Sequence, residues 1–215
     1  MLLIFDFDGT LADTRELIVE TNQEVMRRMG YPVKSEDEIG ATIGLPLVEG
    51  LLHMFPDLPK ESLDAWVSMY REVFEDLRHR IVPSLFPGVK ETLTKLHSDG
   101  HVLTVASSRK NASLNGFLQD MGVAPLFSYV VGVEDVTKAK PHPEPVLKTL
   151  EAFGCPASGA MVIGDMPVDI RMGAGAGVRT CGVSYGNASR EILLSAGADY
   201  VIDSLPELIS LVAIG

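Results

Sequence analysis

Short runs of strand-forming residues recur along the chain and alternate with stretches that have the hydrophobic spacing of helices. A parallel strand can follow another only after a crossover, which is usually a helix, so this alternation predicts a parallel sheet with helices on both faces. The expected fold is therefore a doubly wound α/β domain. The predicted strands are residues 2–7, 101–107, 129–133, 160–165, 178–183 and 198–202.

Residues 15–81 interrupt the alternation. Their hydrophobic residues follow helical spacing throughout, and no core-type strand run occurs among them. We therefore expect a small α-helical cap domain, residues 15–81, inserted into an α/β core that comprises residues 1–14 and 82–215. The chain would cross between the two near residues 13–16 and 80–84, and these crossings would act as hinges.

Composition excludes several classes of protein. The chain has 215 residues, 46% of them hydrophobic, and a formal net charge of −11. An acidic chain is a poor match for nucleic acid, although local cations or a metal can still attract a small anion. The two cysteines, Cys155 and Cys181, have no ligand-like spacing and indicate a reduced compartment. No apolar run approaches the roughly 18 residues of a membrane helix. We expect a soluble, cytoplasmic monomer or homodimer with no nucleic-acid or membrane partner.

Polar side chains follow the predicted strands at the edge where ligands bind. In an open parallel sheet this edge is formed by the carboxyl ends of the strands. Four acidic residues, two hydroxyls and a lysine should therefore meet there from separate parts of the chain. They are Asp6 and Asp8 after the first strand, Ser107 and Ser108 after the second, Lys140 in the segment after the third, and Asp165 and Asp169 after the fourth.

The carboxylates are suited to binding a divalent cation. Attack on a phosphate monoester is opposed by its negative oxygens, and a metal ion offsets that charge. Mg²⁺ prefers oxygen ligands and typically takes one or two carboxylates, which Asp6 and Asp165 can supply. Asp169 would orient water molecules on the metal or pair with Lys140. Thr10 is expected to shape the turn after the first strand.

The hydroxyls and the lysine are suited to binding the phosphate itself. Ser107 comes at the end of a strand and before a helix, where a hydroxyl and free backbone N–H groups can hold an anion. Lys140 would supply a fixed cation for both the nucleophile and the phosphoryl group. Ser108 and Arg109 fit either of two interpretations, as helix-capping and surface residues or as phosphate and substrate contacts; we assign Ser108 to the phosphate site.

Four motifs in this order resemble those of the haloacid dehalogenase-like hydrolase superfamily. They are DFDGTLADT at residues 6–14, the strand ending ASS at 106–108, the KP pair at 140–141 and GDxxxD at 164–169. A helical insert directly after the first motif, with KPHPEP and AGVRT…GVSYG further on, resembles the phosphoglycolate-phosphatase-like branch. The resemblance implies a Rossmann-like core with a cap and a Mg²⁺-dependent phosphatase activity. The implied substrate is a small phosphorylated metabolite, such as phosphoglycolate or a sugar phosphate, with pyrophosphate as a further candidate.

The resemblance also implies roles for the first two aspartates. Asp6 would be the nucleophile that forms an aspartyl-phosphate, while its other oxygen holds the metal. The backbone carbonyl of Asp8 would be a further metal ligand. Because Gly9 lets the chain turn away from the strand, the Asp8 side chain would act as general acid to the leaving alcohol and then as general base to water.

Two positions depart from the family pattern. Met166 follows Asp165 where a small polar residue is common, so one hydrogen bond to water on the metal can be missing. Ser108 and Arg109 stand where phosphoglycolate phosphatases often have an Asn-Lys pair. Neither departure changes the expected chemistry, but both leave the substrate open. Cap residues 42–48 are the candidates for setting specificity.

Two other functions fit the same motifs. A sugar phosphomutase has both aspartates but usually grips its sugar with a cap loop that contains arginine. The corresponding stretch, TIGLPLVEG at residues 42–50, has none, which favours a phosphatase. A catalytically inactive scaffold should have lost at least one of four residues, and all four are present: Asp6, Asp8, Lys140 and Asp165.

Overall fold

A six-stranded parallel sheet forms the centre of the molecule in the computed structural model, which describes residues 1–213. The strand order is β5-β4-β1-β6-β7-β8. Each predicted strand is present, so the predicted fold class is confirmed; the third strand starts two residues earlier than expected. The strands are β1 (Leu2–Phe5), β4 (Val102–Ala106), β5 (Phe127–Val131), β6 (Ala160–Gly164), β7 (Arg179–Val183) and β8 (Tyr200–Ile202).

The central strand β1 lies between the strand that leads to Ser107 and Ser108 and the strand that leads to Asp165 and Asp169. Its partners are β4 on one side and β6 on the other, both parallel to it. Phe5, the last residue of β1, is level with Val105 of β4 and Ile163 of β6. The three strands therefore end together, and the segments that follow them meet at one edge, where the direction of winding reverses.

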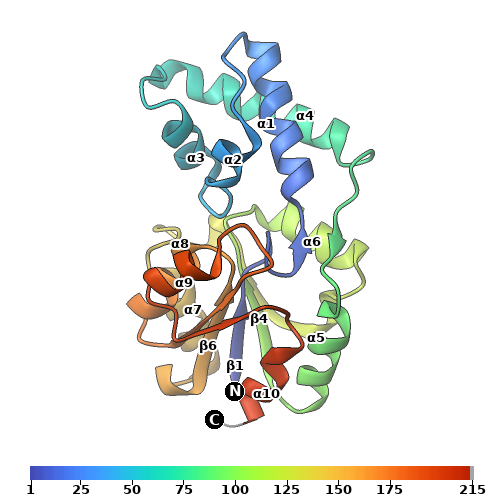
Figure 1. Cartoon of the computed structure of the whole chain (residues 1–215), viewed down its shortest axis with the longest axis vertical. Coiled ribbons are helices and arrows are strands. Elements are labelled where there is room, and N and C mark those ends of the chain that lie inside the picture. Colours follow the sequence, from blue (N-terminus) through green and yellow to red (C-terminus); the bar gives the residue numbers. More distant parts are fainter. Residues whose placement is uncertain (214–215) are drawn as a thin grey trace.

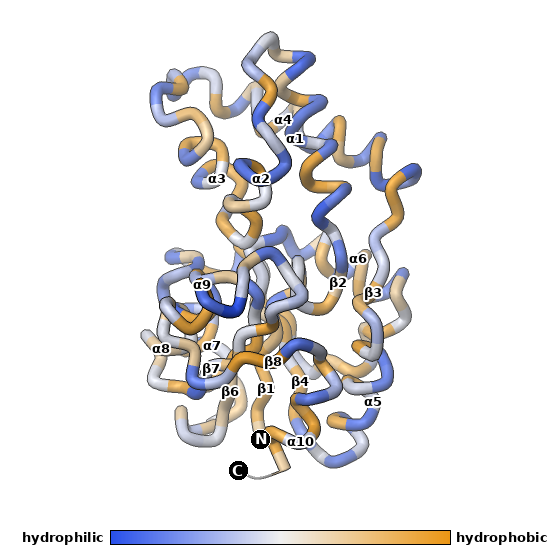
Figure 2. Tube along the Cα trace, viewed as in Figure 1, coloured by the Kyte–Doolittle hydropathy of each residue, from blue (hydrophilic) through white to orange (hydrophobic). Residues whose placement is uncertain are grey.

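Helices cover both faces of the sheet (Figure 1). Leu3 and Phe5 of β1 pack against one layer, whereas Leu2 and Ile4 pack against the other, as the two-residue period of a strand requires. Figure 2 shows β1 as a continuous hydrophobic segment, which is typical of a strand buried on both faces. The first layer is α5 (Val89–Ser98), α6 (Asn111–Asp120) and α10 (Glu207–Ala213); the second is α7 (Glu144–Phe153) and α8 (Pro167–Gly175), with α9 (Arg190–Ser195) packed beside α8.

Four further helices form a separate cap above the carboxyl edge of the sheet (Figure 1). The cap has its own hydrophobic core, centred on the fully buried Trp66 and flanked by the rings of Tyr31 and Phe55. Aromatic rings bury large apolar areas, so these three rings contribute strongly to the stability of so small a unit. The helices are α1 (Arg15–Met29), α2 (Glu36–Gly40), α3 (Leu47–Met54) and α4 (Leu63–Leu77); 3₁₀ turns occur at Lys60–Ser62 in the cap and at Ala124–Leu126, Val133–Asp135 and Ala157–Gly159 in the core.

The two passages of the chain between core and cap are joined to each other. β2 (Ala12–Asp13) and β3 (Ser84–Leu85) pair antiparallel as a two-residue ribbon. Sequence analysis did not predict it, because two residues are too few to show a strand period. The predicted hinges at 13–16 and 80–84 fall on or next to this ribbon, and their movement remains a prediction.

Candidate active site

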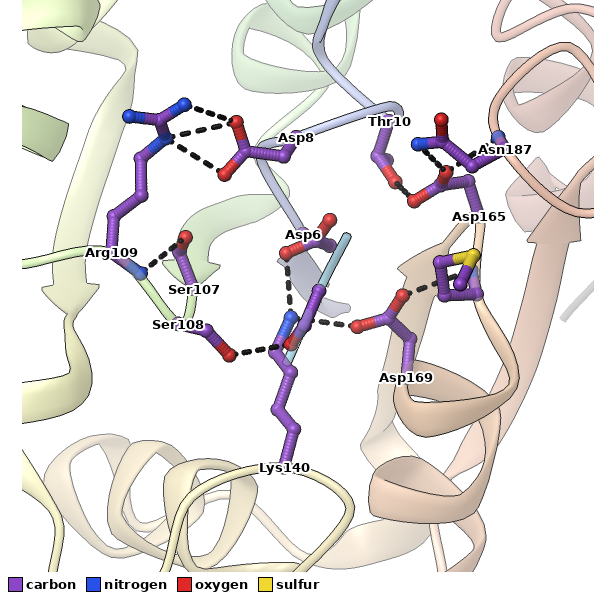
Figure 3. A network of polar contacts seen from close by, with 12 residues as sticks. Asp6, Asp8, Thr10, Ser107, Ser108, Arg109, Lys140, Asp165, Asp169 and Asn187 are labelled. Atoms are coloured by element: carbon purple, nitrogen blue, oxygen red, sulfur yellow. Dashed lines mark hydrogen bonds and ion pairs between the residues drawn. The ribbon is translucent and has the colours of Figure 1, made fainter. Parts of the chain in front are cut away.

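Asp6 and Asp8 leave the end of β1 in different directions. The amide of Asp6 still donates to the carbonyl of Ile163 at 2.8 Å, so this residue is held beside β6. After it the chain turns sharply: Gly9 has a φ of +81°, which favours glycine, and the amide of Ala12 donates back to the Phe7 carbonyl at 3.0 Å. Figure 3 shows the result, with Asp6 directed toward Lys140 and Asp8 toward Arg109.

Lys140 is a buried cation between two carboxylates. Its Nζ donates to Asp6 Oδ1 at 2.5 Å and to Asp169 Oδ1 at 2.6 Å, and only 2% of its side chain is exposed. Burial alone would lower the pKa of Lys140, but the carboxylates of Asp169 and Asp6 outweigh that effect and raise it above its ordinary value. The ammonium group is therefore charged at any physiological pH.

Asp165 is held from two sides. Its Oδ2 accepts hydrogen bonds from the backbone amide and the side-chain Nδ2 of Asn187, at 2.7 and 2.8 Å, and its Oδ1 accepts one from Thr10 Oγ1 at 3.2 Å. Burial and the nearby charge of Asp169 raise the pKa of Asp165 to about 7, although the Asn187 and Thr10 hydrogen bonds lower it. A carboxylate in this environment is most stable as an anion when a cation lies next to it.

Asn187 is a site residue that sequence analysis missed. It follows the end of β7, at Val183, by four residues and so reaches the same edge of the sheet as the predicted residues. The GVSYG stretch before it resembled the family, and the position after a strand end was the available signal.

The backbones of two glycines pack directly against the side chain of Asp165. A Cβ added to Gly9 would lie 2.2 Å from Asp165 Oδ2, and one added to Gly186 would lie 2.4 Å from the Cβ of Asp165. Neither position has room for a side chain, so both loops approach the carboxylate with their backbones.

Asp6, Asp165 and Asp169 form a buried acidic cluster. Each offers a carboxylate oxygen within 4.8 Å of the other two. Asp6 Oδ2 is buried and has no hydrogen-bond partner among the described residues, and burial raises the pKa of Asp6 well above its usual value although Lys140 opposes the shift. An unpartnered oxygen beside two more carboxylates, all of them hard oxygen donors, fits a magnesium ion. The predicted ligands Asp6 and Asp165 lie here; Asp169, predicted as a supporting residue, lies here too, whereas the Asp8 side chain does not.

Asp8 forms an ion pair with Arg109. The Nε of Arg109 donates to both carboxylate oxygens, at 2.9 and 2.7 Å, its Nη2 donates to Oδ1 at 2.6 Å, and Thr14 Oγ1 donates to the same Oδ1 at 2.6 Å. The guanidinium also lies over three aromatic rings: Phe117 at 4.9 Å, Phe74 at 5.4 Å and Phe7 at 5.8 Å. Because Phe74 belongs to α4, Arg109 joins Asp8 to the cap. Of its two sequence interpretations, a solvated surface residue is therefore wrong.

The two serines after β4 make different contacts. Ser107 is buried, and its Oγ accepts a hydrogen bond from the Arg109 amide at 3.2 Å. Ser108 Oγ instead donates to the carbonyl of Gly44 in the cap, at 2.6 Å (Figure 3). The hydroxyl hydrogen of Ser107 has no acceptor among residues 1–213, so it can serve a ligand. The Ser108 hydroxyl hydrogen is already used to hold the cap loop.

Met166, the departure noted beside Asp165, packs away from the polar groups. Its side chain lies in a small apolar cluster with Ile170, Ala188 and Leu193. Its backbone amide donates to Asp169 Oδ2 at 3.1 Å, which helps to hold that carboxylate toward Lys140. The methionine therefore fixes α8 against the core beside the acidic cluster.

A cavity of about 680 Å³ lies between the cap and the carboxyl edge of the sheet. Asp6, Asp8 and Arg109 line its core side, and residues 42–48 line part of its cap side. The cap residues singled out from the sequence thus line the same cavity as Asp6 and Asp8. No helix within residues 1–213 has both the length and the apolar character to cross a membrane.

Comparisons with known proteins agree with this architecture. The family model described as haloacid dehalogenase-like hydrolase matches residues 3–183. Probable phosphatase IndB of Dickeya dadantii is 34% identical, with 97% of this chain and 91% of that protein aligned. Pyrophosphatase PpaX of Bacillus velezensis is 30% identical, with 99% and 96% aligned.

Solved structures have the same fold. A crystal structure assigned as a haloacid dehalogenase-like hydrolase from Bacteroides fragilis superposes with a TM-score of 0.90 at 30% identity, covering 96% of this chain and 98% of that one. A predicted phosphoglycolate phosphatase from Haemophilus somnus also gives 0.90, at 23% identity, covering 98% and 97%. At that lower identity the likeness concerns the fold alone.

Proposed function

The chain belongs to the haloacid dehalogenase-like hydrolases and is a phosphatase; we propose that it requires Mg²⁺ and hydrolyses a small phosphate monoester through an aspartyl-phosphate on Asp6. The observation that carries the proposal is the environment of Asp6. One of its oxygens contacts Lys140, and the other is buried beside Asp165 and Asp169 without a partner among residues 1–213. A carboxylate held in this way is positioned, poorly solvated and close to a set of metal ligands.

Asp6 and Asp165, supported by Asp169, would hold the magnesium ion, with the Asp8 carbonyl as a further ligand. When bound, the ion supplies positive charge that offsets the phosphate oxygens and the clustered carboxylates. Asn187 and Thr10 orient Asp165 toward this position through the hydrogen bonds described above.

The protein's own groups then account for each step. Asp6 attacks phosphorus, while Lys140 and the Ser107 hydroxyl stabilise the phosphoryl oxygens. Asp8 gives a proton to the leaving alcohol and later takes one from the water that hydrolyses the aspartyl-phosphate. To do so, its carboxyl group has to exchange part of its contact with Arg109 for contact with the substrate.

In this proposal the cap, residues 15–81, closes over the bound ester. The core, residues 1–14 and 82–215, provides the catalytic residues. Closure excludes water and strengthens the charge interactions around the phosphoryl group. Phosphoglycolate and sugar phosphates are the substrates inferred from the sequence, and pyrophosphate is named for relatives of this chain. The Gly44-Leu45-Pro46 stretch at the cavity offers no arginine for a sugar, so transfer to water is favoured over a mutase reaction.

The test is phosphate release from p-nitrophenyl phosphate and a panel of metabolite phosphates, with Mg²⁺ and with EDTA. We expect release that depends on Mg²⁺ and is abolished in Asp6→Asn, together with an acid-precipitable phosphoenzyme in the unmodified protein and none in the variant. Substantial turnover by Asp6→Asn would overturn the assignment of the nucleophile. Equal rates with EDTA would overturn the metal requirement.

A further inference from the structure

We propose that the physiological substrate is a phosphate monoester of a bulky apolar alcohol, whose hydrocarbon body fills the cavity between the cap and the sheet. This inference rests on the proposed phosphatase function and concerns which esters that site accepts. It is carried by the size of the cavity, by the residues that line it and by the distribution of charge around it.

The cavity is much larger than a phosphoryl group needs. Its volume of about 680 Å³ is in the range of roughly 300–1,000 Å³ that holds drug-sized ligands. A phosphoryl group replaces only a few water molecules of about 30 Å³ each. With its phosphorus placed against Asp6, phosphoglycolate or pyrophosphate would therefore leave most of the volume to water.

The cap side of the cavity is lined mainly by apolar side chains, although polar ones such as Asn22, Arg71 and Glu75 also line it. Its lining includes Leu45, Leu47, Leu51, Met54, Val67 and Phe74, from the loop before α3 and from α3 and α4. In Figure 1 the connection between α2 and α3 is the part of the cap that descends toward the core, and the Ser108 hydrogen bond to Gly44 holds it there. A hydrocarbon group gains from leaving water for such a wall, whereas an anion without cations or N–H donors beside it loses.

Most of the cations that line the cavity are already paired with carboxylates. Arg109 pairs with Asp8, Arg78 with Glu75 at 3.5 Å, and Lys110 with Glu134 at 3.5 Å. Among the described residues, Arg71 is the cation of the lining that has no acidic partner within 4 Å, and it is solvent-exposed. Arg71 could therefore bind the carboxylate or second phosphate of an anionic substrate. The experiment has to distinguish such a substrate from an ester with an apolar body.

The first experiment measures kcat/KM for ethyl, n-butyl and n-hexyl phosphate, with phosphoglycolate and pyrophosphate alongside. The alkyl esters have similar leaving groups, so chain length tests burial alone. Each methylene that enters the cavity should raise kcat/KM about fourfold, and hexyl should exceed ethyl on the order of a hundredfold. Rates that are flat with chain length, or a preference for phosphoglycolate that Arg71→Gln removes, would overturn the proposal.

Matched variants localise the effect. Leu47→Gln, at a partly exposed cavity position, should lower the ratio of the hexyl to the ethyl kcat/KM by removing most of the gain from the longer chain. Leu147→Gln makes the same exchange at a 47%-exposed position on α7, outside the cavity, and should change neither rate. Equal behaviour of the two variants would count against the cavity as the binding site.

A binding measurement separates this inference from the proposed function. Ethyl- and n-hexylphosphonate cannot be hydrolysed, and calorimetry in Mg²⁺ should show the longer compound binding at least tenfold more tightly. Tighter binding of the longer phosphonate with no turnover of any ester, p-nitrophenyl phosphate included, would support the ligand class and overturn the phosphatase activity. Turnover of esters without a chain-length effect on binding would overturn the ligand class alone.

Discussion

The guanidinium of Arg109 meets both carboxylate oxygens of Asp8, at 2.6 to 2.9 Å, while its face lies on a ring from the cap. Both side chains are only 11% exposed, so neither charge is well solvated without the other. The carboxyl group assigned to proton transfer is thus held by a residue that also contacts α4. The position of the cap and the position of Asp8 are linked through this one side chain.

Breaking that pair should destabilise the fold. Arg109→Met leaves the Asp8 carboxylate buried without a cation, and we expect a loss of about 3 kcal/mol in the free energy of unfolding. The double variant Arg109→Met with Asp8→Asn removes both charges and should recover part of that loss. Urea unfolding of the four proteins in the cycle measures this directly; purely additive effects would show that the pair is not coupled.

Asp8→Asn should affect esters according to their leaving groups. Alkyl phosphates need a proton delivered to the departing oxygen, so their turnover should fall about 10²- to 10⁴-fold. p-Nitrophenolate leaves without a proton, so formation of the aspartyl-phosphate from p-nitrophenyl phosphate should be affected much less. Burst kinetics on the two substrates separate this step from hydrolysis. Equal losses in the first step would argue against the acid role.

Mg²⁺ should stabilise the protein through the acidic cluster. At about 100 times its dissociation constant a ligand adds about 2.7 kcal/mol, which for a chain of this size raises Tm by roughly 5–10 °C. Asp165→Asn should abolish the increase and leave the metal-free protein at least as stable, because one of three clustered negative charges is gone. Asp203→Asn, at an exposed position, is the control and should keep the full increase. If Mg²⁺ raised the Tm of Asp165→Asn as much as that of the unmodified protein, the metal would not bind at this cluster.

Asn187→Ala should weaken metal binding without unfolding the protein. The variant loses the Nδ2 hydrogen bond to Asp165 but keeps the one from its backbone amide. Loss of such an orienting contact typically reduces metal affinity 10- to 100-fold, so half-maximal activity should need correspondingly more Mg²⁺. Asn115→Ala, on the exposed side of α6, serves as the comparison. Identical Mg²⁺ requirements in the two variants would contradict the role given to Asn187.

Gly9→Ala and Gly30→Ala separate backbone strain from steric conflict. Both glycines have positive φ, +81° and +73°, so each alanine should cost about 1–2 kcal/mol. At position 9 the new Cβ meets Asp165, whereas at position 30 no atom of the described chain, the adjacent residues aside, lies within 4 Å of it. Gly9→Ala should therefore also lose activity and the thermal response to Mg²⁺, while Gly30→Ala should retain both. Full activity in Gly9→Ala would show that the turn can move away from Asp165.

The regular alternation of strand-type and helix-type segments made the fold of the core predictable from the sequence. Each of the six strands is a short β-type run between helical stretches, so the alternation defines the parallel sheet without knowledge of any contact. The residues after the strands follow from the same rule, and Asp6, Lys140, Asp165 and Asp169 do lie together. The rule gives the edge of the sheet at which a residue lies but not the direction of its side chain.

The features of the site that the sequence did not predict depend on contacts between segments that are far apart in the chain. Arg109 looks like a surface residue until the rings of Phe7, Phe74 and Phe117, from three separate parts of the chain, are brought around it. Ser108 faces the cap because Gly44 lies above it, which no local pattern contains. The gathering of large apolar side chains on the cap side of the cavity likewise arises only when the cap is placed over the sheet.

The ribbon formed by β2 and β3 has a mechanical consequence. Two unpaired connecting segments would let the cap twist and slide over the sheet. Because the segments here are hydrogen-bonded to each other, we expect them to bend together as one ribbon. Bending of such a ribbon is easier than shearing it, since shear would break its hydrogen bonds. We therefore expect the cap to rotate about a single axis at this ribbon, so that each closure would bring the same residues of the cap back over Asp6.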